Sequence, residues 1–375
     1  QACLRLLYDL GMDAVSEDRA GVVLLADDDP LVRKIMSRTL ERAGLEVLAA
    51  ATDTEALALF RGHAERIDVA ILDVTGETFG EVQAVVPDKV PNTYTDADAM
   101  YRDFAPDAVL VTMEPWRMSE PILQALDSGA HVFHEKPGYV DIEDYRAIYQ
   151  LAQSRDRHLC IAYPCRKYPI VQEARRMVAE GMLGDLFALQ GWFIADHERT
   201  WQSNPRKELN EAAGGWFFSK EKAGGGHLVI LGCHYLDLFR YITGANFKSV
   251  AAMCKNVGGE AITADDAAML TIEFDNGMLG SLNSGYYTSS AEYKSGRHNG
   301  IYLFGREGWM RFNTAGSSSQ QPLEWSSNDG VGGNAPLKSW VFNEKADENH
   351  GDVYEQMTSQ FFRACRGEDV PPLEP

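Results

Sequence analysis

Short apolar runs alternate with amphipathic segments along the N-terminal part of the chain. Three apolar runs have the length and the polar flanks of buried strands: 21–30, 45–51 and 66–74. Between them, residues 31–44 and 52–66 repeat apolar positions at helical spacing. Strands that alternate with helices pair in parallel and are joined by right-handed crossovers. The pattern therefore predicts half of a doubly wound α/β sheet.

A second set of expected elements follows after residue 80, where the sequence pattern changes. Four elements are expected: a buried strand at 108–113, a helix at 119–130, a strand at 131–137 and a mostly apolar helix at 227–241. Gly129 lies at the C-terminal end of the first of these helices, where glycine is typical. Three glycines, 224–226, precede the second helix and would allow close backbone approach.

Carboxylates follow two of the expected N-terminal strands. Asp27 and Asp28 end the first strand and Asp73 ends the third, at the strand ends where open α/β sheets bind ligands. Mg²⁺ would be the ion of this pocket if the pocket is functional. Residues 22–74 resemble the first part of a response-regulator receiver domain, which implies that Asp73 is the phosphoacceptor. Because the receiver pattern stops at Val74, the alternative is a set of strand-end carboxylates on a partial or fused unit.

Polar side chains form a stripe along the expected helix at 227–241: His227, His234, Asp237 and Tyr241. Buried polar groups need partners, since an unpaired one costs about 1–3 kcal/mol. A bound polyol would supply those partners. Two alternatives stay open: the protein itself satisfies the stripe, or His227 and His234 share a metal ion, although the sequence offers no evident third ligand.

The motif Glu135-Lys136-Pro137 and several later segments occur in the order found in the Gfo/Idh/MocA oxidoreductases, which residues 80–375 resemble. The later segments are 160–186, 224–244, 264–286 and 299–313. The resemblance implies the second half of a Rossmann-type dinucleotide-binding domain at 76–165, after a receiver-like segment at 1–75. It also implies a substrate and oligomerisation domain at 166–375. The expected fold is an α/β doubly wound parallel sheet followed by an α+β domain with a large open, mostly antiparallel sheet.

Lys136, His234 and Asp237 are the expected catalytic residues. Oxidation of a secondary alcohol needs a base at the hydroxyl proton while a hydride leaves the carbon for nicotinamide. His234 suits that role because an imidazole titrates near neutral pH. Lys136 could polarise the same oxygen or relay its proton, and Asp237, one helical turn further, could orient a ring or a hydroxyl.

The resemblance also implies further contacts. Pro137 fixes the turn after the strand, in the family often through a cis peptide. The expected cofactor contacts are Met113, Pro115, Glu135, Lys136 and Pro137, and the expected substrate contacts are Tyr163, Arg166, His227 and Tyr241. In the family an Asp lies four residues before the His, but Ile230 stands there, so His227 or Tyr163 is expected to take over a contact.

The dinucleotide-binding fingerprint of the family, a strand, G-x-G-x-x-G and a helix, is missing from the sequence. The segment 75–80 supplies two glycines at the wrong spacing, and the 34 residues between Val74 and Val109 leave marginal room for two crossovers. Either the receiver-like strands complete the parallel sheet, or two fragments are joined at an imperfect seam. Because three carboxylates repel pyrophosphate unless a cation intervenes, binding of NAD or NADP is expected to be weak or absent.

Composition and charge exclude several classes of partner. A net charge of −20 without any basic block argues against nucleic acid and anionic membranes. No run reaches the roughly 20 apolar residues of a membrane span and no leader-like segment opens the chain, so a cytoplasmic location is expected. The six cysteines lack the paired spacing of a zinc site, and no metal site is expected from them. Both ends of the chain are expected to be cut.

The function expected first is an NAD(P)-dependent oxidoreductase that moves a hydride between nicotinamide and a secondary hydroxyl of a sugar, cyclitol or related polyol. It would be impaired if nothing replaces the glycine loop. The alternatives are a glycosidase of the same fold that uses NAD for a transient oxidation, a non-catalytic sugar-binding protein, or a receiver-type signalling module with Asp73 as phosphoacceptor. By resemblance, a homo-oligomer is expected to form through the C-terminal sheet.

Overall fold

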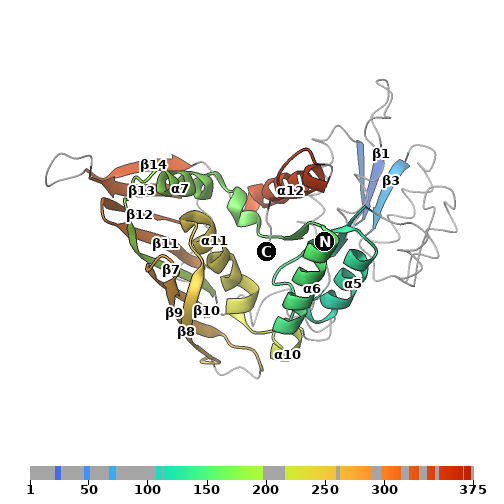
Figure 1. The fold of residues 1–375 in the computed structure, drawn as a ribbon, viewed down its shortest axis with the longest axis horizontal. Coiled ribbons are helices and arrows are strands. Elements are labelled where there is room, and N and C mark those ends of the chain that lie inside the picture. Colours follow the sequence, from blue (N-terminus) through green and yellow to red (C-terminus); the bar gives the residue numbers. More distant parts are fainter. Residues whose placement is uncertain are drawn as a thin grey trace.

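The computed structural model describes three short N-terminal strands and most of the chain after residue 106 (Figure 1). The described residues are 22–26, 46–50, 67–72, 107–111, 114–196, 216–258, 262–288, 297–313, 321–328, 336–342, 346–365 and 367–372. Asp27, Asp28, Asp73 and Met113 lie outside these residues, so the roles given to them above stay predictions from the sequence.

The three predicted N-terminal strands are present and parallel. They are β1 (Val22–Ala26), β2 (Glu46–Ala50) and β3 (Ile67–Leu72), and they form a sheet in the order β2-β1-β3. Ala26 pairs with Leu72 in parallel register, so β1 and β3 end at the same edge of the sheet.

A second parallel sheet carries the segment that contains Lys136. Its strands are β4 (Ala108–Val111), β5 (His131–His134) and β6 (Leu159–Ile161), in the order β4-β5-β6. The connecting helices are α5 (Pro115–Asp127) and α6 (Ile142–Arg155). Buried Met118 and Ile122 of α5 and Ile148 of α6 pack with Val132 of β5. Gly129 has a φ of +94°, which explains why a glycine follows α5.

The C-terminal region is built on an eight-stranded, mostly antiparallel sheet, as predicted. Its order is β14-β13-β12-β11-β7-β10-β9-β8. Among the described strands of this sheet, only the β7–β10 pair is parallel. The strands are β7 (Leu186–Asp196), β8 (Phe247–Lys255), β9 (Ala267–Phe274), β10 (Leu279–Thr288), β11 (Arg297–Gly305), β12 (Gly308–Phe312), β13 (Gln321–Ser327) and β14 (Lys338–Phe342).

Helices α7 (Pro169–Ala179) and α11 (Cys233–Thr243) lie on one face of this sheet (Figure 1). The core between them contains Ile170 and Met177 of α7, Phe239 of α11, and inward residues of the sheet such as Ile272 and Leu303. Alternate residues along β9 are buried and exposed, which is the pattern of a strand covered on one side. The sheet is therefore a platform that holds the two helices.

The helix predicted at 227–241 is present, but it is not a regular α-helix throughout. A short helix α10 (Lys220–Ala223) precedes the glycines, a π-helical turn η4 (Leu228–Gly232) follows His227, and the regular α11 begins only at Cys233. A Cβ at Gly232 would lie 2.7 Å from Ser284 Oγ, so the chain passes β10 closely at this turn. Helical spacing therefore does not place His227 and His234 on one stripe.

The long helix α12 (Ala346–Cys365) near the C-terminus was not predicted from the sequence. Its buried residues Met357 and Phe361 are four apart and pack against Phe133 of β5 and Cys160 of β6. α12 therefore covers the sheet that carries Lys136. Among the helices that the structure describes, none has the length and apolar composition needed to cross a membrane.

Candidate active site

Lys136 lies in the turn that follows β5. The Lys136–Pro137 peptide is cis, the form that the family resemblance implies. Lys136 Nζ donates a hydrogen bond of 2.9 Å to the carbonyl oxygen of Ile230, in the π-helical turn η4. Ile230 stands where the family has an Asp, and in this chain its backbone oxygen accepts the hydrogen bond from Lys136. The turn after β5 and the segment before α11 are therefore in direct contact.

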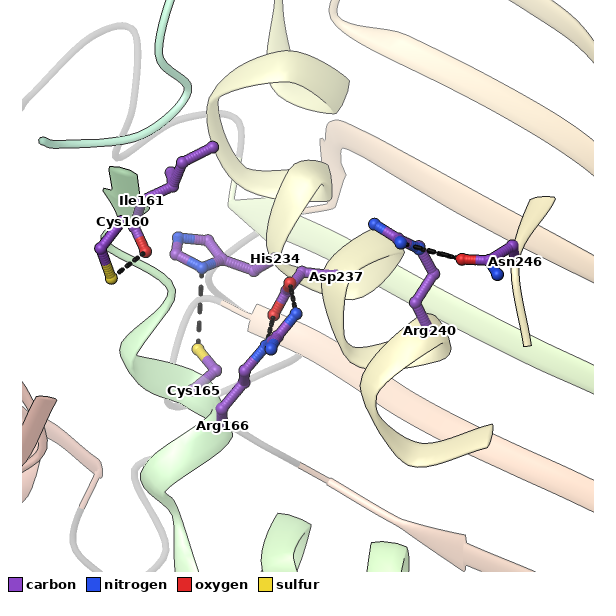
Figure 2. Close-up of polar contacts among 8 residues, drawn as sticks. All are labelled: Cys160, Ile161, Cys165, Arg166, His234, Asp237, Arg240 and Asn246. Atoms are coloured by element: carbon purple, nitrogen blue, oxygen red, sulfur yellow. Dashed lines mark hydrogen bonds and ion pairs between the residues drawn. The ribbon is translucent and has the colours of Figure 1, made fainter. Parts of the chain in front are cut away.

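His234 lies in the first turn of α11 and is buried. Its Nδ1 is 3.8 Å from Cys165 Sγ (Figure 2). Its ring meets the ring of Tyr163 edge-on, with centroids 5.7 Å apart. Cys165 belongs to the 3₁₀ turn η3 (Pro164–Lys167), directly after β6. The ring of His234 therefore lies between the helix α11 and the segment after β6.

Cys233 and Tyr163 complete this group of side chains. Cys233 Sγ is 3.7 Å from the Ile230 oxygen that also binds Lys136, and it shares a hydrogen bond with Tyr163. Burial raises the pKa of the Cys233 thiol to about 11 and the pKa of the Tyr163 phenol well above its usual value of 10. Both groups are neutral near pH 7, so Tyr163 cannot replace a carboxylate as a base. The predicted residues Lys136, after β5, and His234, in α11, therefore both contact this group: Lys136 lies beside Cys233 and Ile230, and His234 contacts Tyr163.

Arg166 and Asp237 form an ion pair next to this group (Figure 2). Arg166 Nε and Nη2 donate to the two carboxylate oxygens over 2.8 and 2.5 Å. Burial raises the pKa of Asp237, and the guanidinium of Arg166 opposes that shift. The ring of Tyr241 lies beneath Arg166 at 4.8 Å and beneath Arg175 at 4.2 Å. The three residues predicted to touch the substrate or to orient it therefore contact one another.

His227 faces the sheet instead of the side chains around Lys136. It is fully buried, its Nδ1 is 2.6 Å from Ser284 Oγ, and its ring contacts Tyr286 and Phe193. The prediction of one stripe with His234 is therefore wrong, because the wide turn η4 rotates the two residues apart. Within the part of the chain that the structure describes, no group of three or more His, Cys, Asp or Glu side chains could hold a metal ion.

The glycines before His227 allow the backbone to pass close to another segment of the protein. Gly226 N donates to Asp265 Oδ1 over 3.0 Å, and His227 N donates to the Asp265 carbonyl over 3.2 Å. A Cβ at Gly226 would lie 1.6 Å from that carbonyl oxygen. The expected close backbone approach is present, but its partner is Asp265 in the segment before β9.

Glu135 and Pro115 occupy the carboxyl edge of the sheet β4-β5-β6. Glu135 accepts a bond from the backbone N–H of Lys136 over 3.2 Å and another from Tyr354 of α12. Burial raises the pKa of Glu135. Pro115 is the first residue of α5, and the helix has no side-chain cap among the described residues. The sequence offered no local signal for Tyr354 or for the two thiols, since their roles come from contacts between distant segments.

Two family models match consecutive parts of the chain. Residues 44–163 match "Oxidoreductase family, NAD-binding Rossmann fold", and residues 171–311 match "GFO/IDH/MocA C-terminal domain". The first match begins before Val74 and continues past it, so it covers part of the segment compared above with a receiver domain. It gives that comparison no support.

The chain is also similar to characterised proteins. It is 28% identical to a levoglucosan dehydrogenase of Pseudarthrobacter phenanthrenivorans over 52% of each chain. It is 28% identical to a D-glucoside 3-dehydrogenase of Escherichia coli over 57% of this chain and 62% of the relative. The chain thus spans little more than half the length of these relatives. A levoglucosan dehydrogenase solved with NADH and levoglucosan shares the fold, with a TM-score of 0.65, 18% identity, and coverage of 94% of this chain and 92% of the other.

Proposed function

Because the chain belongs to the Gfo/Idh/MocA oxidoreductase family, we propose that it transfers a hydride between a nicotinamide cofactor and a secondary hydroxyl of a sugar or related polyol. The observation that carries the proposal is that Lys136, at the carboxyl end of β5, binds the backbone oxygen of Ile230, four residues before His234, whose ring contacts Tyr163 after β6. The relatives are named as dehydrogenases of levoglucosan and of a D-glucoside, which supports a sugar substrate.

Residues at the ends of β4 and β5 would hold the cofactor. Pro115, Glu135, Lys136 and Pro137 lie there, and Met113 follows β4 in the sequence. The residues present fit such a group, because the first N–H groups of α5 have no side-chain cap among the described residues and point positive partial charge outward. The cofactor, when bound, supplies the hydride acceptor. Since the sequence lacks G-x-G-x-x-G, the affinity is expected to be low.

The proton of the substrate hydroxyl would go to the imidazole of His234. Lys136 has three N–H donors, of which one goes to the Ile230 oxygen. The other two can bind the substrate oxygen and stabilise the negative charge that grows on it as the proton leaves. The side chains of Tyr163 and Cys233 beside them are neutral near pH 7 and add no competing base.

The test is an incubation of the protein with NAD⁺ or NADP⁺ and levoglucosan, methyl D-glucoside or scyllo-inositol, with absorbance of the reduced nicotinamide as the readout. We expect turnover that Lys136→Ala abolishes. Lys220→Ala is the control, because Lys220 is exposed on α10. If none of the three substrates leads to reduction of the cofactor, the proposal is contradicted. Sugar release from an aryl glycoside without net cofactor reduction would favour the glycosidase instead.

A homo-oligomer through the outer face of the large sheet is part of the proposal. Met253 of β8 pairs in register with Met269 of β9, and these side chains are 75% and 59% exposed. Leu279 at the start of β10 is 56% exposed. Large apolar side chains grouped on a sheet face are typical of interfaces. Light scattering during gel filtration should show an oligomer, and the double variant Met253→Glu with Met269→Glu should dissociate it. A monomeric wild-type chain would contradict the proposed oligomer.

One observation favours a second candidate for the N-terminal strands. Their order β2-β1-β3 is that of flavodoxin-like sheets, whereas the dinucleotide-binding order places β2 between β1 and β3. Asp27 and Asp73 directly follow the paired ends of β1 and β3 in the sequence. Labelling by acetyl phosphate in the presence of Mg²⁺ that disappears in Asp73→Asn would support a phosphoacceptor, and absence of labelling would dismiss it.

A further inference from the structure

Three aromatic side chains lie behind the turn that carries Lys136. They are His134 at the end of β5, Tyr139 after the turn, and Tyr145 on α6. His134 and Tyr139 are buried, and the ring of Tyr139 contacts both of its neighbours, with centroids 5.1 and 4.4 Å away. None of the three was singled out from the sequence.

His134 holds the carbonyl group that precedes Lys136. Its Nδ1 is 2.8 Å from the Glu135 carbonyl oxygen, which can only accept, so Nδ1 carries the hydrogen. Nε2 then accepts from the Tyr139 hydroxyl over 2.9 Å. Burial lowers the pKa of His134 to about 4, so the ring keeps this neutral tautomer at physiological pH.

Tyr145 holds the carbonyl group that follows Lys136. Its hydroxyl donates to the Pro137 carbonyl oxygen and accepts from Tyr139 N over 3.3 Å. Gly138 has a φ of +97°, and a Cβ there would lie 2.8 Å from the Tyr145 hydroxyl oxygen. The glycine therefore allows the tyrosine to reach the backbone.

We propose that His134, Tyr139 and Tyr145 are positioning residues that fix the direction of the Lys136 side chain. The inference rests on the proposed function, in which Lys136 binds the substrate oxygen. The backbone carbonyls on both sides of Lys136 are held by this group, and its Nζ is held from the opposite side by the Ile230 oxygen. Because a displacement of about 1 Å at a reacting group can cost about a hundredfold in rate, such a fixed turn matters for catalysis.

Tyr145→Phe tests the inference, because it removes only the hydroxyl that binds Pro137. Tyr149→Phe is the matched control, since Tyr149 lies on the same helix, is exposed, and bonds only Gln153 among the described contacts. We expect kcat to fall about tenfold to a hundredfold in Tyr145→Phe, with the control unchanged. A purely structural role would lower thermal stability and leave kcat per folded molecule unchanged, which would overturn the inference.

A second readout does not depend on turnover. In protein made with lysine labelled at Cε with ¹³C, the NMR signal of Lys136 is assigned by its loss in Lys136→Met. We expect Tyr145→Phe and Tyr139→Phe to shift this signal and leave the other lysine signals in place. An unmoved Lys136 signal would overturn the positioning role. A shifted signal in a protein that reduces no cofactor would support the positioning role and contradict the proposed function instead.

Discussion

The ion pair between Arg166 and Asp237 should stabilise the chain and should not act on the substrate. Asp237→Asn removes the negative charge and keeps the shape of the side chain. Arg166 then remains charged in a place where its side chain is only 16% exposed, beside a partner that was 7% exposed. We therefore expect a loss of stability that exceeds any specific effect on the chemical step.

The magnitude follows from the burial of the pair. Removal of one partner of a buried ion pair costs about 3–5 kcal/mol, because the other charge is left uncompensated. At the lower end of that range, about 3 kcal/mol, the unfolded population rises more than a hundredfold. An apolar pair, Arg166→Met with Asp237→Leu, should recover most of the loss, since neither buried charge remains.

The assay is urea unfolding followed by tryptophan fluorescence, with kcat measured on the folded fraction of each variant. Glu180→Gln is the control, because its pair with Arg176 is exposed on both sides and should contribute less than about 1 kcal/mol. An Asp237→Asn variant that unfolds within about 0.5 kcal/mol of the wild type but has lost its turnover would refute this reasoning and would return Asp237 to the catalytic group.

Three further changes test the packing around the site. Burial lowers the pKa of His134 from 6.5 to about 4, so the unfolded chain binds the proton at a higher pH than the folded chain. The free energy of unfolding should therefore fall by about 3 kcal/mol between pH 6.5 and 4. His134→Gln should weaken this pH dependence, measured by urea unfolding at several pH values. Gly226→Ala would drive a Cβ into the Asp265 carbonyl and should destabilise by about 3 kcal/mol or more. Gly225→Ala should cost less in the same thermal scan, because its Cβ would press on the Val229 side chain and lie at ordinary contact distance from Asp265 Oδ1. Phe361→Ala in α12 should cost about 3–5 kcal/mol in urea unfolding, because the ring is fully buried.

The sequence pattern located the elements that follow from local spacing. The strands β1 to β5 lie within or beside the predicted runs, because burial on one or both faces leaves a period in the sequence. The strands β9 to β12 lie within or beside the segments 264–286 and 299–313, which the family resemblance indicated. α12 was overlooked although Met357 and Phe361 have helical spacing. The π-helical turn before α11 was not predicted; it lies where Gly232 packs closely against Ser284 of β10, a contact between distant segments.

The candidate site shows the same division. Lys136 and His234 could be found because a motif and a polar residue on an apolar helix are visible locally. Their partners could not, because periodicity tells which face a residue occupies and not what lies opposite. Asp237 binds an arginine 71 residues away and His227 a serine 57 residues away, and neither partner could be read from the local pattern.

The central claim is that a hydride passes from the substrate carbon to nicotinamide beside Lys136 and His234. The most direct measurement uses the sugars named above with deuterium at their ring carbons, together with NAD⁺, and determines the mass of the reduced cofactor. The account predicts reduced nicotinamide that carries one deuterium, and loss of this product in Lys136→Ala. Oxidised sugar without deuterium in the cofactor, or labelled cofactor that forms equally well in Lys136→Ala, would contradict it.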